Sequence, residues 1–231
     1  VSGDYSRFVI TLDADAEGEA AISLVEQVRS VLDEMYPGTY YLAGDGVSTY
    51  DLMDTITADN LKVNLIAIGA VFVVLLLSFK SLSLPVILVL SIETAIWINM
   101  AIPYFRGSTV FYISYLIVSS IQLGATVDYA ILFADRYMEF RALLPKREAV
   151  SKTVSAITVS VCTSGSAIIV VGLGLGFVSK HGIISQLGFF LGIGGALSLT
   201  VVLFVLPGLM YLFDGIIRRT TLHANFLPSK E

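Results

Sequence analysis

The clearest chemical signal in this 231-residue sequence is an acidic residue followed by a tyrosine, Asp128-Tyr129, inside an apolar run from Gly107 to Ala134. A carboxylate in hydrocarbon is costly, so it is retained mainly where it faces a helix-bundle interior or a wet cavity and marks an ion or proton pathway. We therefore interpret Asp128 as a proton-carrying or ion-carrying group. The alternative is a structural acid held in an interhelical hydrogen bond.

The depth and the neighbours of Asp128 support this interpretation. The carboxylate lies seven residues before the polar pair Asp135-Arg136, which at ~1.5 Å per residue places it about 10 Å inside a helical span. Gly124 shares its helical face and would allow a neighbouring helix to approach closely. Tyr129 points about 100° away on the same helix and can reach a second partner.

Glu93 is a second acidic residue within an apolar segment, where it is accompanied by Thr94 and Asn99. It can act as a relay member or as a contact for substrate. It can equally be a packed, protonated acid, because burial disfavours the charged form. The sequence does not decide between these roles.

Small polar residues recur at spacings of three or four on a later apolar segment: Ser155, Thr158, Cys162 and Ser166. Such a stripe, with Thr158 and Cys162 at its centre, can carry water beside Asp128. Small residues are also common where membrane helices pack closely, so packing is the simpler interpretation.

Other motifs carry less chemistry. The glycines in Gly172-x-Gly174-x-Gly176 and Gly188-xxx-Gly192 are interpreted as packing or hinge residues. His181 and His223 have no ligand-spaced companions, so no metal site is expected. An intramembrane aspartyl protease needs two carboxylates that share a proton, and no other predicted span supplies an aspartate to pair with Asp128, so an enzyme is not expected.

Composition defines the class of protein. Hydrophobic residues make up 55% of the chain and charged residues 14%, and the mean hydropathy is +0.81. These values predict a polytopic α-helical membrane protein. Up to Asn60 there are two basic and twelve acidic residues, whereas the remainder has twelve basic and seven acidic ones. This division predicts an acidic aqueous domain joined to a membrane domain, and no nucleic-acid partner.

The acidic region, residues 1–60, has the pattern of a partial α+β domain. Ser6–Leu12 and Thr39–Ala43 are rich in strand formers, and Glu19–Met35 has apolar residues at helical spacing. A β-α-β unit with two strands is too small to close a core, so we expect a truncated domain. Ser48 and Asp51 resemble a capping box that opens a helix leading towards the membrane.

The membrane domain, residues 61–217, contains five apolar segments, each long enough to cross about 30 Å of hydrocarbon as a helix. These are Leu61–Phe79, Leu84–Ile102, Val110–Tyr137, Thr153–Ser179 and Ile183–Phe213. Most basic residues lie on one side: Lys80, Arg136 and Lys152 accompany those of the connector at about 138–150 and of the tail 218–231. The positive-inside rule then predicts a cytoplasmic C-terminus and an extracytoplasmic N-terminal domain, and Phe140–Val150 is expected to form an amphipathic interfacial helix.

Three motifs resemble those of MMPL-type transporters of the resistance-nodulation-division (RND) superfamily. They are Tyr50-Asp-Leu-Met-Asp-Thr-Ile56 before the first span, Ser78-Phe-Lys-Ser-Leu-Ser-Leu-Pro85 after it, and Gly124-Ala-Thr-Val-Asp-Tyr129 running into Asp135-Arg-Tyr137. The resemblance covers essentially the whole chain and is to the C-terminal half of such a transporter. It implies five helices of an RND-type half, with the end of an extracytoplasmic, ferredoxin-like porter subdomain.

The resemblance also implies a mechanism. Family members consist of two similar halves, and Asp-Tyr pairs on the fourth and tenth spans face each other as a proton relay, which corresponds to Asp128 and Tyr129. The other pair would come from an N-terminal half or a partner chain. Protons would be the coupling ion, with no further cofactor, and the multi-pass protein would lie in the cytoplasmic membrane.

The implied substrates are lipids or other hydrophobic or amphiphilic molecules, exported at the expense of the proton-motive force. No lysine occurs between Leu84 and Pro145, unlike the relay of the multidrug pumps, which favours the lipid-exporter branch. Two alternatives stay open: a sterol-sensing-like module that binds lipid without transporting it, and a SecDF-like factor that assists protein export.

Overall fold

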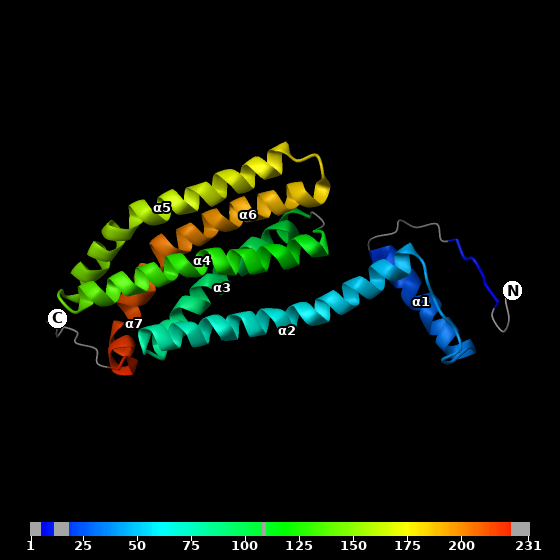
Figure 1. Ribbon diagram of the computed structural model, residues 1–231, viewed down its shortest axis with the longest axis horizontal. Helices are drawn as coiled ribbons and strands as arrows, with labels where there is room; N and C mark the ends of the chain where they lie inside the picture. Colours follow the sequence, from blue (N-terminus) through cyan, green and yellow to red (C-terminus); the bar gives the residue numbers. More distant parts are fainter. Residues whose placement is uncertain (1–5, 12–18, 108–109, 223–231) are drawn as a thin grey trace. The chain divides into compact units, whose positions relative to one another are not determined.

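The computed structural model describes residues 6–11, 19–107 and 110–222. The chain divides into two compact units, Val1–Lys62 and Val63–Glu231, and Figure 1 shows the helices of both. One long helix, α2 (Asp45–Phe79), begins in the first unit and continues into the second.

In the first unit, α1 (Glu19–Met35) has the bounds that its apolar periodicity predicts. Its apolar face buries Ala21 and Val25. Polar contacts join α1 to the first turns of α2: Arg29 donates to Asp51 at 2.7 Å, and the Tyr50 hydroxyl donates to Glu26 at 3.1 Å. Because both contacts are solvent-exposed, they contribute little to stability. Their main effect is to determine which turns of α1 and α2 face each other.

The two predicted strands of this unit are not formed. Residues 6–11 and Tyr40–Ala43 have no strand structure in the described chain, and Leu12 lies outside the described residues. The strand formers Phe8 and Tyr41 are 85% and 89% exposed. Strand propensity reflects packing against neighbouring strands, and these segments have no such neighbour here, so the β-α-β prediction is wrong for the residues described.

The second unit is a helical bundle. After α2 the chain forms α3 (Ser83–Arg106), α4 (Tyr112–Arg141), α5 (Lys146–Val178), α6 (Gly182–Thr200), a π-helical turn η1 (Val201–Val205) and α7 (Leu206–Thr220). Five helical stretches are long and apolar enough to span a membrane, with α6, η1 and α7 forming one of them. The five predicted spans are therefore confirmed.

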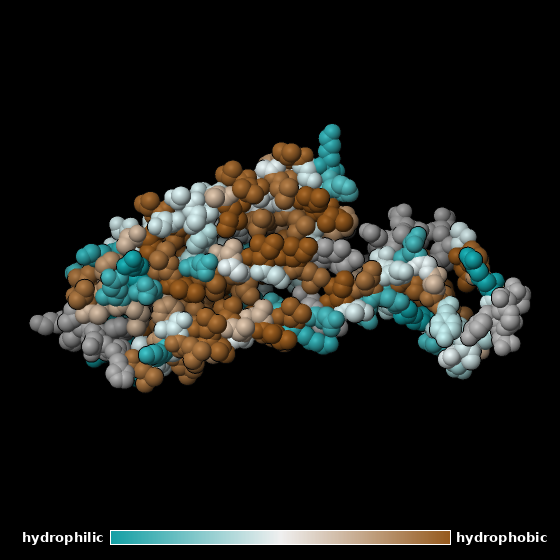
Figure 2. Space-filling model, viewed as in Figure 1, coloured by the Kyte–Doolittle hydropathy of each residue, from teal (hydrophilic) through white to brown (hydrophobic). Residues whose placement is uncertain are grey.

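The surface of this unit suits a lipid environment. Large apolar side chains such as Trp97, Phe177 and Phe204 are 63%, 77% and 76% exposed, and apolar residues cover much of the visible face of the bundle in Figure 2. Contiguous apolar surface of this kind is unusual on a water-soluble domain. Together with the helix lengths it identifies a multi-pass membrane protein.

The predicted amphipathic helix over Phe140–Val150 does not exist as a separate element. Instead α4 continues to Arg141, a short turn follows, and α5 begins at Lys146 after Pro145. Leu143 of the predicted helix is 68% exposed, whereas Ala149 belongs to the bundle core and Phe140 packs against that core. Phe140 and Ala149 pack on the other helices because they extend the inner faces of α4 and α5.

The last span contains a local distortion where α6 meets α7. Pro207 is the second residue of α7, separated from the π-helical turn by Leu206 alone. Proline has no amide hydrogen, so the normal backbone bond to the residue four positions earlier cannot form there. A π-helical turn is one way of accommodating that interruption, and such turns often occur at functional sites.

The closest helix contact joins α5 to α6 and depends on glycine. A Cβ atom added at Gly172 would lie 2.5 Å from the backbone nitrogen of Gly192, and one added at Gly188 would collide with the backbone of Gly176. The backbones therefore touch directly, as small residues allow in membrane bundles. The interpretation of these four glycines as packing residues is confirmed, whereas Gly174 has nothing within 4 Å of its added Cβ.

Gly172→Ala is expected to destabilise the bundle by about 1–3 kcal/mol, because overpacking against backbone forces the two helices apart. Gly174→Ala, two residues away on the same helix, meets open space and should be neutral or stabilising by up to about 1 kcal/mol. Thermal unfolding of the purified variants in detergent would measure both. Equal melting temperatures would contradict the direct backbone contact.

Candidate functional site

Asp128 lies on a face of α4 that no other described helix covers. Its side chain is exposed in this chain, and so are Gly124 and Ile121 on the same face. A Cβ added at Gly124 would meet nothing within 4 Å. Asp128 makes no hydrogen bond or ion pair with any described residue. The chain thus presents a carboxylate with an open space beside it. At this depth in the span, lipid hydrocarbon would surround the carboxylate if neither protein nor water covered it.

Tyr129 points in a different direction, into the bundle, where it is 9% exposed and belongs to the core. No hydrogen bond joins its hydroxyl to Asp128 or to another described group. Consecutive residues on a helix point about 100° apart, which accounts for the separation. The Asp-Tyr motif therefore places a carboxylate on the open face of α4 and a phenol on the covered face.

Glu93 is buried in the same bundle, on α3. It is 4% exposed, and neither carboxyl oxygen has a hydrogen-bond partner within the described chain. A charged, unpaired carboxylate would be costly in such a place. No hydrogen bond connects Glu93 to Asp128 or Tyr129 in the described chain.

The polar stripe on α5 is only partly covered. Cys162 is a free thiol of intermediate exposure, and the Thr158 hydroxyl donates to the carbonyl of Val154 in its own helix at 2.5 Å. The buried face of α5 is a neighbouring one, with Ile157, Val161 and Gly165. The stripe is not hydrogen-bonded to Asp128 in the described chain.

A buried polar network that the sequence did not reveal links α3, α4 and α6. The Asn99 amide donates to Gln122 at 2.8 Å and to the carbonyl of Phe190 at 3.0 Å. The Gln122 amide donates to Ser198 at 3.2 Å, and the Thr126 hydroxyl donates to the same serine at 3.0 Å. Every one of these polar side chains is nearly inaccessible, so the network specifies how the three helices meet.

The network approaches Tyr129. A cavity of about 10 Å³ is lined by Gln122, Thr126, Ser198 and Tyr129 together with apolar residues. Gln122, Thr126 and Tyr129 follow one another at spacings of four and three, which puts them on one face of α4. This spacing identifies the polar face of α4 from the sequence alone. It does not identify the partners Asn99 and Ser198, which come from other helices.

A second missed cluster ties the end of α4 to α7. Arg141 forms a bidentate ion pair with Asp214, at 2.9 Å from Nε to Oδ1 and 3.1 Å from Nη2 to Oδ2. The Tyr137 hydroxyl donates to Asp214 Oδ1 at 2.6 Å. Arg141 and Tyr137 are fully buried, and Asp214 is 6% exposed. This arrangement is a structural clamp between two helices.

Metal ligation is not indicated in the described part of the chain, where no group of three or more histidine, cysteine, aspartate or glutamate side chains could hold an ion. Among the predicted site residues, Asp128 is the carboxylate that the described chain leaves uncovered, on the open face of α4. The fold and the site together define the class of protein. It is a polytopic helical membrane protein with an acid on the open face of one span.

The chain belongs to the MMPL family, whose family model matches residues 2–221. This match confirms the resemblance that the motifs indicated. The chain is also 25% identical over 210 residues to a protein of Mycobacterium tuberculosis (strain ATCC 25618 / H37Rv) named as a probable transport protein, MmpL9. The aligned region covers 84% of this chain and 21% of that relative, so the chain spans about a fifth of the relative's length.

Proposed function

We propose that this chain is part of a proton-coupled membrane transporter that exports lipids or other amphiphilic molecules, with Asp128 as the group that binds and releases the proton. The observation that carries the proposal is the position of Asp128, exposed on an uncovered face of a membrane-spanning helix. A carboxylate there costs about 2.5–3.5 kcal/mol on insertion scales if lipid surrounds it. A helix or a wet cavity must therefore cover this face in the working protein.

The shape of that face supports a close helix partner. Gly124 lies one turn from Asp128 and leaves space for another backbone. By the family resemblance, the covering span would carry a second Asp-Tyr pair, supplied by another part of the same polypeptide or by a partner chain. Proton binding to Asp128 would remove a charge from this contact, and the helices would repack in response.

Reconstitution tests the proposal. The complete protein that contains this chain is placed in liposomes with a fluorescent phospholipid and a pH-sensitive dye, and a pH gradient is imposed. We expect lipid movement that depends on the gradient and is accompanied by proton flux. Lipid binding without either flux would contradict transport and would favour the lipid-sensing alternative.

Orientation provides a separate prediction. The distribution of basic residues favours an extracytoplasmic first unit, with the α4–α5 turn in the cytoplasm. In a background that lacks Cys162, Ser30→Cys and Lys180→Cys should react with an impermeant maleimide in intact cells, whereas Ala142→Cys should react only after permeabilisation. All three positions are exposed. Labelling of Ala142→Cys in intact cells would show that the orientation is the reverse of the one predicted.

A further inference from the structure

A pocket with a volume of about 690 Å³ lies at the end of the bundle where α3 stops and α6 begins. Its lining comes from the last turn of α3, the end of α5 and the first part of α6. Figure 1 shows the start of α6 and the α4–α5 turn at opposite ends of the bundle. The pocket therefore lies at the membrane surface opposite the one that the α4–α5 turn reaches.

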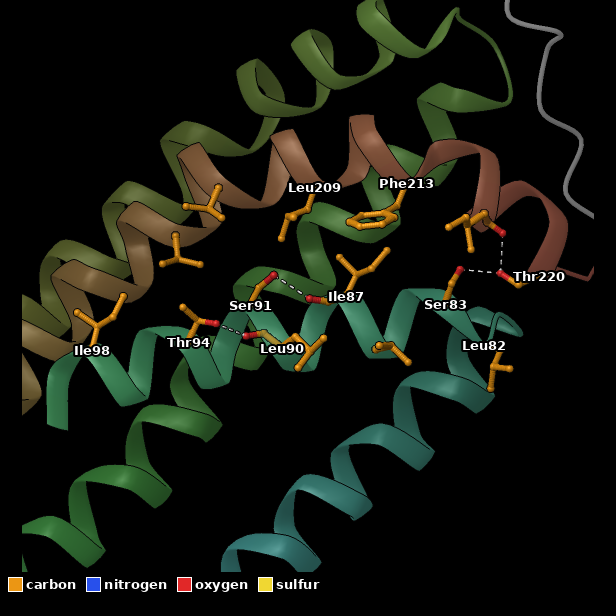
Figure 3. A pocket seen from close by; sticks show the side chains of 14 residues that line it. Leu82, Ser83, Ile87, Leu90, Ser91, Thr94, Ile98, Leu209, Phe213 and Thr220 are labelled. Atoms are coloured by element: carbon orange, nitrogen blue, oxygen red, sulfur yellow. Dashed lines mark hydrogen bonds between the residues drawn. The ribbon is translucent and has the colours of Figure 1, made fainter. Parts of the chain in front are cut away.

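This pocket is distinct from the longer groove shown in Figure 3, which lies between α3 and the last span. The walls of that groove contain no ionisable side chain, and its lining on α3 extends from Leu82 to Ile98. The pocket begins beyond that stretch, at Ile102, and it includes the guanidinium of Arg106. A charged group at the end of an apolar space is the feature that distinguishes the pocket from the groove.

The walls of the pocket are mainly apolar and aromatic. The Phe177 and Phe189 rings meet edge to face with their centroids 4.9 Å apart, and Phe177 is 77% exposed. Phe189 packs closely over Gly176, where an added Cβ would lie 3.0 Å from the ring. The Asn99 amide donates to the carbonyl of Phe190 at 3.0 Å, which holds α3 against α6 beside the pocket. The apolar space is thus formed by contacts within the bundle itself.

The depth of the pocket matches one leaflet of a bilayer. Its lining on α6 extends from Gly182 to Ile193, a rise of roughly 17 Å at ~1.5 Å per residue. The hydrocarbon core is about 30 Å thick, so one leaflet accounts for about 15 Å. A transmembrane helix would extend far beyond the pocket through the other leaflet. An acyl chain that enters from the membrane surface would end where the pocket ends.

The charges around the pocket favour an anion. The segments Ile102–Gly107 and Phe177–Ile193 contain two cationic side chains, Arg106 and Lys180, and no aspartate or glutamate. Arg106 is exposed and forms no hydrogen bond or ion pair with another described residue. The first turn of α6 has no side-chain cap, so the partial positive charge of its amide groups adds to the same field.

The other polar side chains of the pocket connect parts of the bundle to one another. Ser185 donates to the carbonyl of Gly176 at 2.6 Å, and the Gln186 side chain accepts from the Phe111 amide at 2.8 Å. Arg106 is therefore the side chain that can meet a charged ligand without breaking a described contact. A guanidinium suits phosphate in particular, because its planar fork can donate two parallel hydrogen bonds.

We propose that this pocket binds one anionic phospholipid of the surrounding bilayer, with an acyl chain along the aromatic wall and the phosphate on Arg106. The site needs both parts, because the walls alone would accept any lipid and Arg106 alone would accept any anion. No lining residue comes from α4, so the site is separate from Asp128. The lipid is a resident ligand of the leaflet at this end of the bundle, and this inference does not rest on the transport function.

Photolabelling with lipids tests the proposal. The complete protein that contains this chain is reconstituted in phosphatidylcholine liposomes, without a pH gradient. The liposomes contain a small fraction of phosphatidylglycerol or phosphatidylcholine with a diazirine in the acyl chain. After irradiation, mass spectrometry measures the lipid adduct on Gly182–Ile193. The two probes share their chains and differ in net charge, so we expect several-fold more adduct with phosphatidylglycerol.

Two matched pairs of variants assign the effect to the pocket. Arg106→Gln should lower phosphatidylglycerol labelling to the level of phosphatidylcholine. Lys180→Gln removes the same charge at the same end from outside the pocket and should leave labelling unchanged. Phe177→Ala opens the aromatic wall and should lower labelling by both probes. Val178→Ala, at an adjacent position that is 81% exposed and outside the pocket, should not.

Each contrary result overturns the proposal in a recognisable way. Equal labelling by the two probes would indicate lipid that surrounds the protein without selection by charge. An equal loss in Arg106→Gln and Lys180→Gln would indicate a general effect of surface charge. Displacement of phosphatidylglycerol by excess inorganic phosphate at constant ionic strength would assign the site to a free anion. No adduct on Gly182–Ile193 with either probe would show that protein covers the pocket.

Discussion

Asp128→Asn is expected to abolish proton-driven flux while leaving membrane insertion and substrate binding nearly intact. Asparagine has almost the same shape as aspartate but cannot bind and release a proton near neutral pH. Because Asp128 has no hydrogen bond or ion pair with another described residue, the substitution removes no contact that stabilises this bundle. The loss should therefore appear in transport and not in the melting temperature.

A control on the same helix sharpens this test. Asp135 is also exposed on α4 and lies two turns away, close to the end of the span. Asp135→Asn removes the same charge from a position that water can reach, so proton-driven flux should persist. Undiminished flux in liposomes that contain Asp128→Asn would refute the relay and would leave Asp128 as a structural acid.

Tyr129 should contribute less than Asp128. Its side chain is buried on the covered face of α4, and within the described chain its hydroxyl has no partner, so any hydrogen bond in the relay would be to a group from elsewhere or to water. A net hydrogen bond is worth about 1 kcal/mol, or roughly a fivefold change in rate. Tyr129→Phe should accordingly reduce flux severalfold without abolishing it, and a loss equal to that of Asp128→Asn would give Tyr129 a larger role.

The sequence predicts those features that depend on local pattern. Apolar runs of sufficient length identify all five spans, and the helical spacing in Glu19–Met35 identifies α1 with its exact bounds. The depth of Asp128 is also a local property, since it follows from counting residues to the end of an apolar run. These predictions require no information about which helices pack against one another.

Features that depend on partners were not predictable. Strand formers at Phe8 and Tyr41 had the right composition, but strands require neighbours that pair with them. The network around Gln122 joins residues 23 and 76 positions apart. The interfacial helix predicted around Arg141 is wrong for the same reason. Without its partner Asp214 on α7, Arg141 has the pattern of an interfacial cation.

Substitution of Asp214, the partner of Arg141 on α7, is expected to have the largest effect on stability. Asp214→Asn removes the carboxylate that neutralises Arg141, and the guanidinium is then left in a position with 1% of its side chain exposed. Breaking a buried ion pair by removing one partner typically costs about 3–5 kcal/mol, because the charge that stays buried loses the carboxylate that neutralised it. The hydrogen bond from Tyr137 is weakened by the same change. We expect a large fall in the melting temperature in detergent.

Two comparisons separate this burial effect from a general effect of charge. Arg136 and Glu139 form a shorter ion pair, 2.6 Å, on the same helix, but their side chains are 46% and 53% exposed. Glu139→Gln should cost no more than about 1 kcal/mol, as surface pairs do. The double variant Arg141→Met, Asp214→Leu removes both buried charges and should recover most of the stability lost in Asp214→Asn, because apolar replacements of buried ion pairs are often neutral or stabilising. If Asp214→Asn is no more destabilised than Glu139→Gln, the clamp between α4 and α7 does not hold the bundle together.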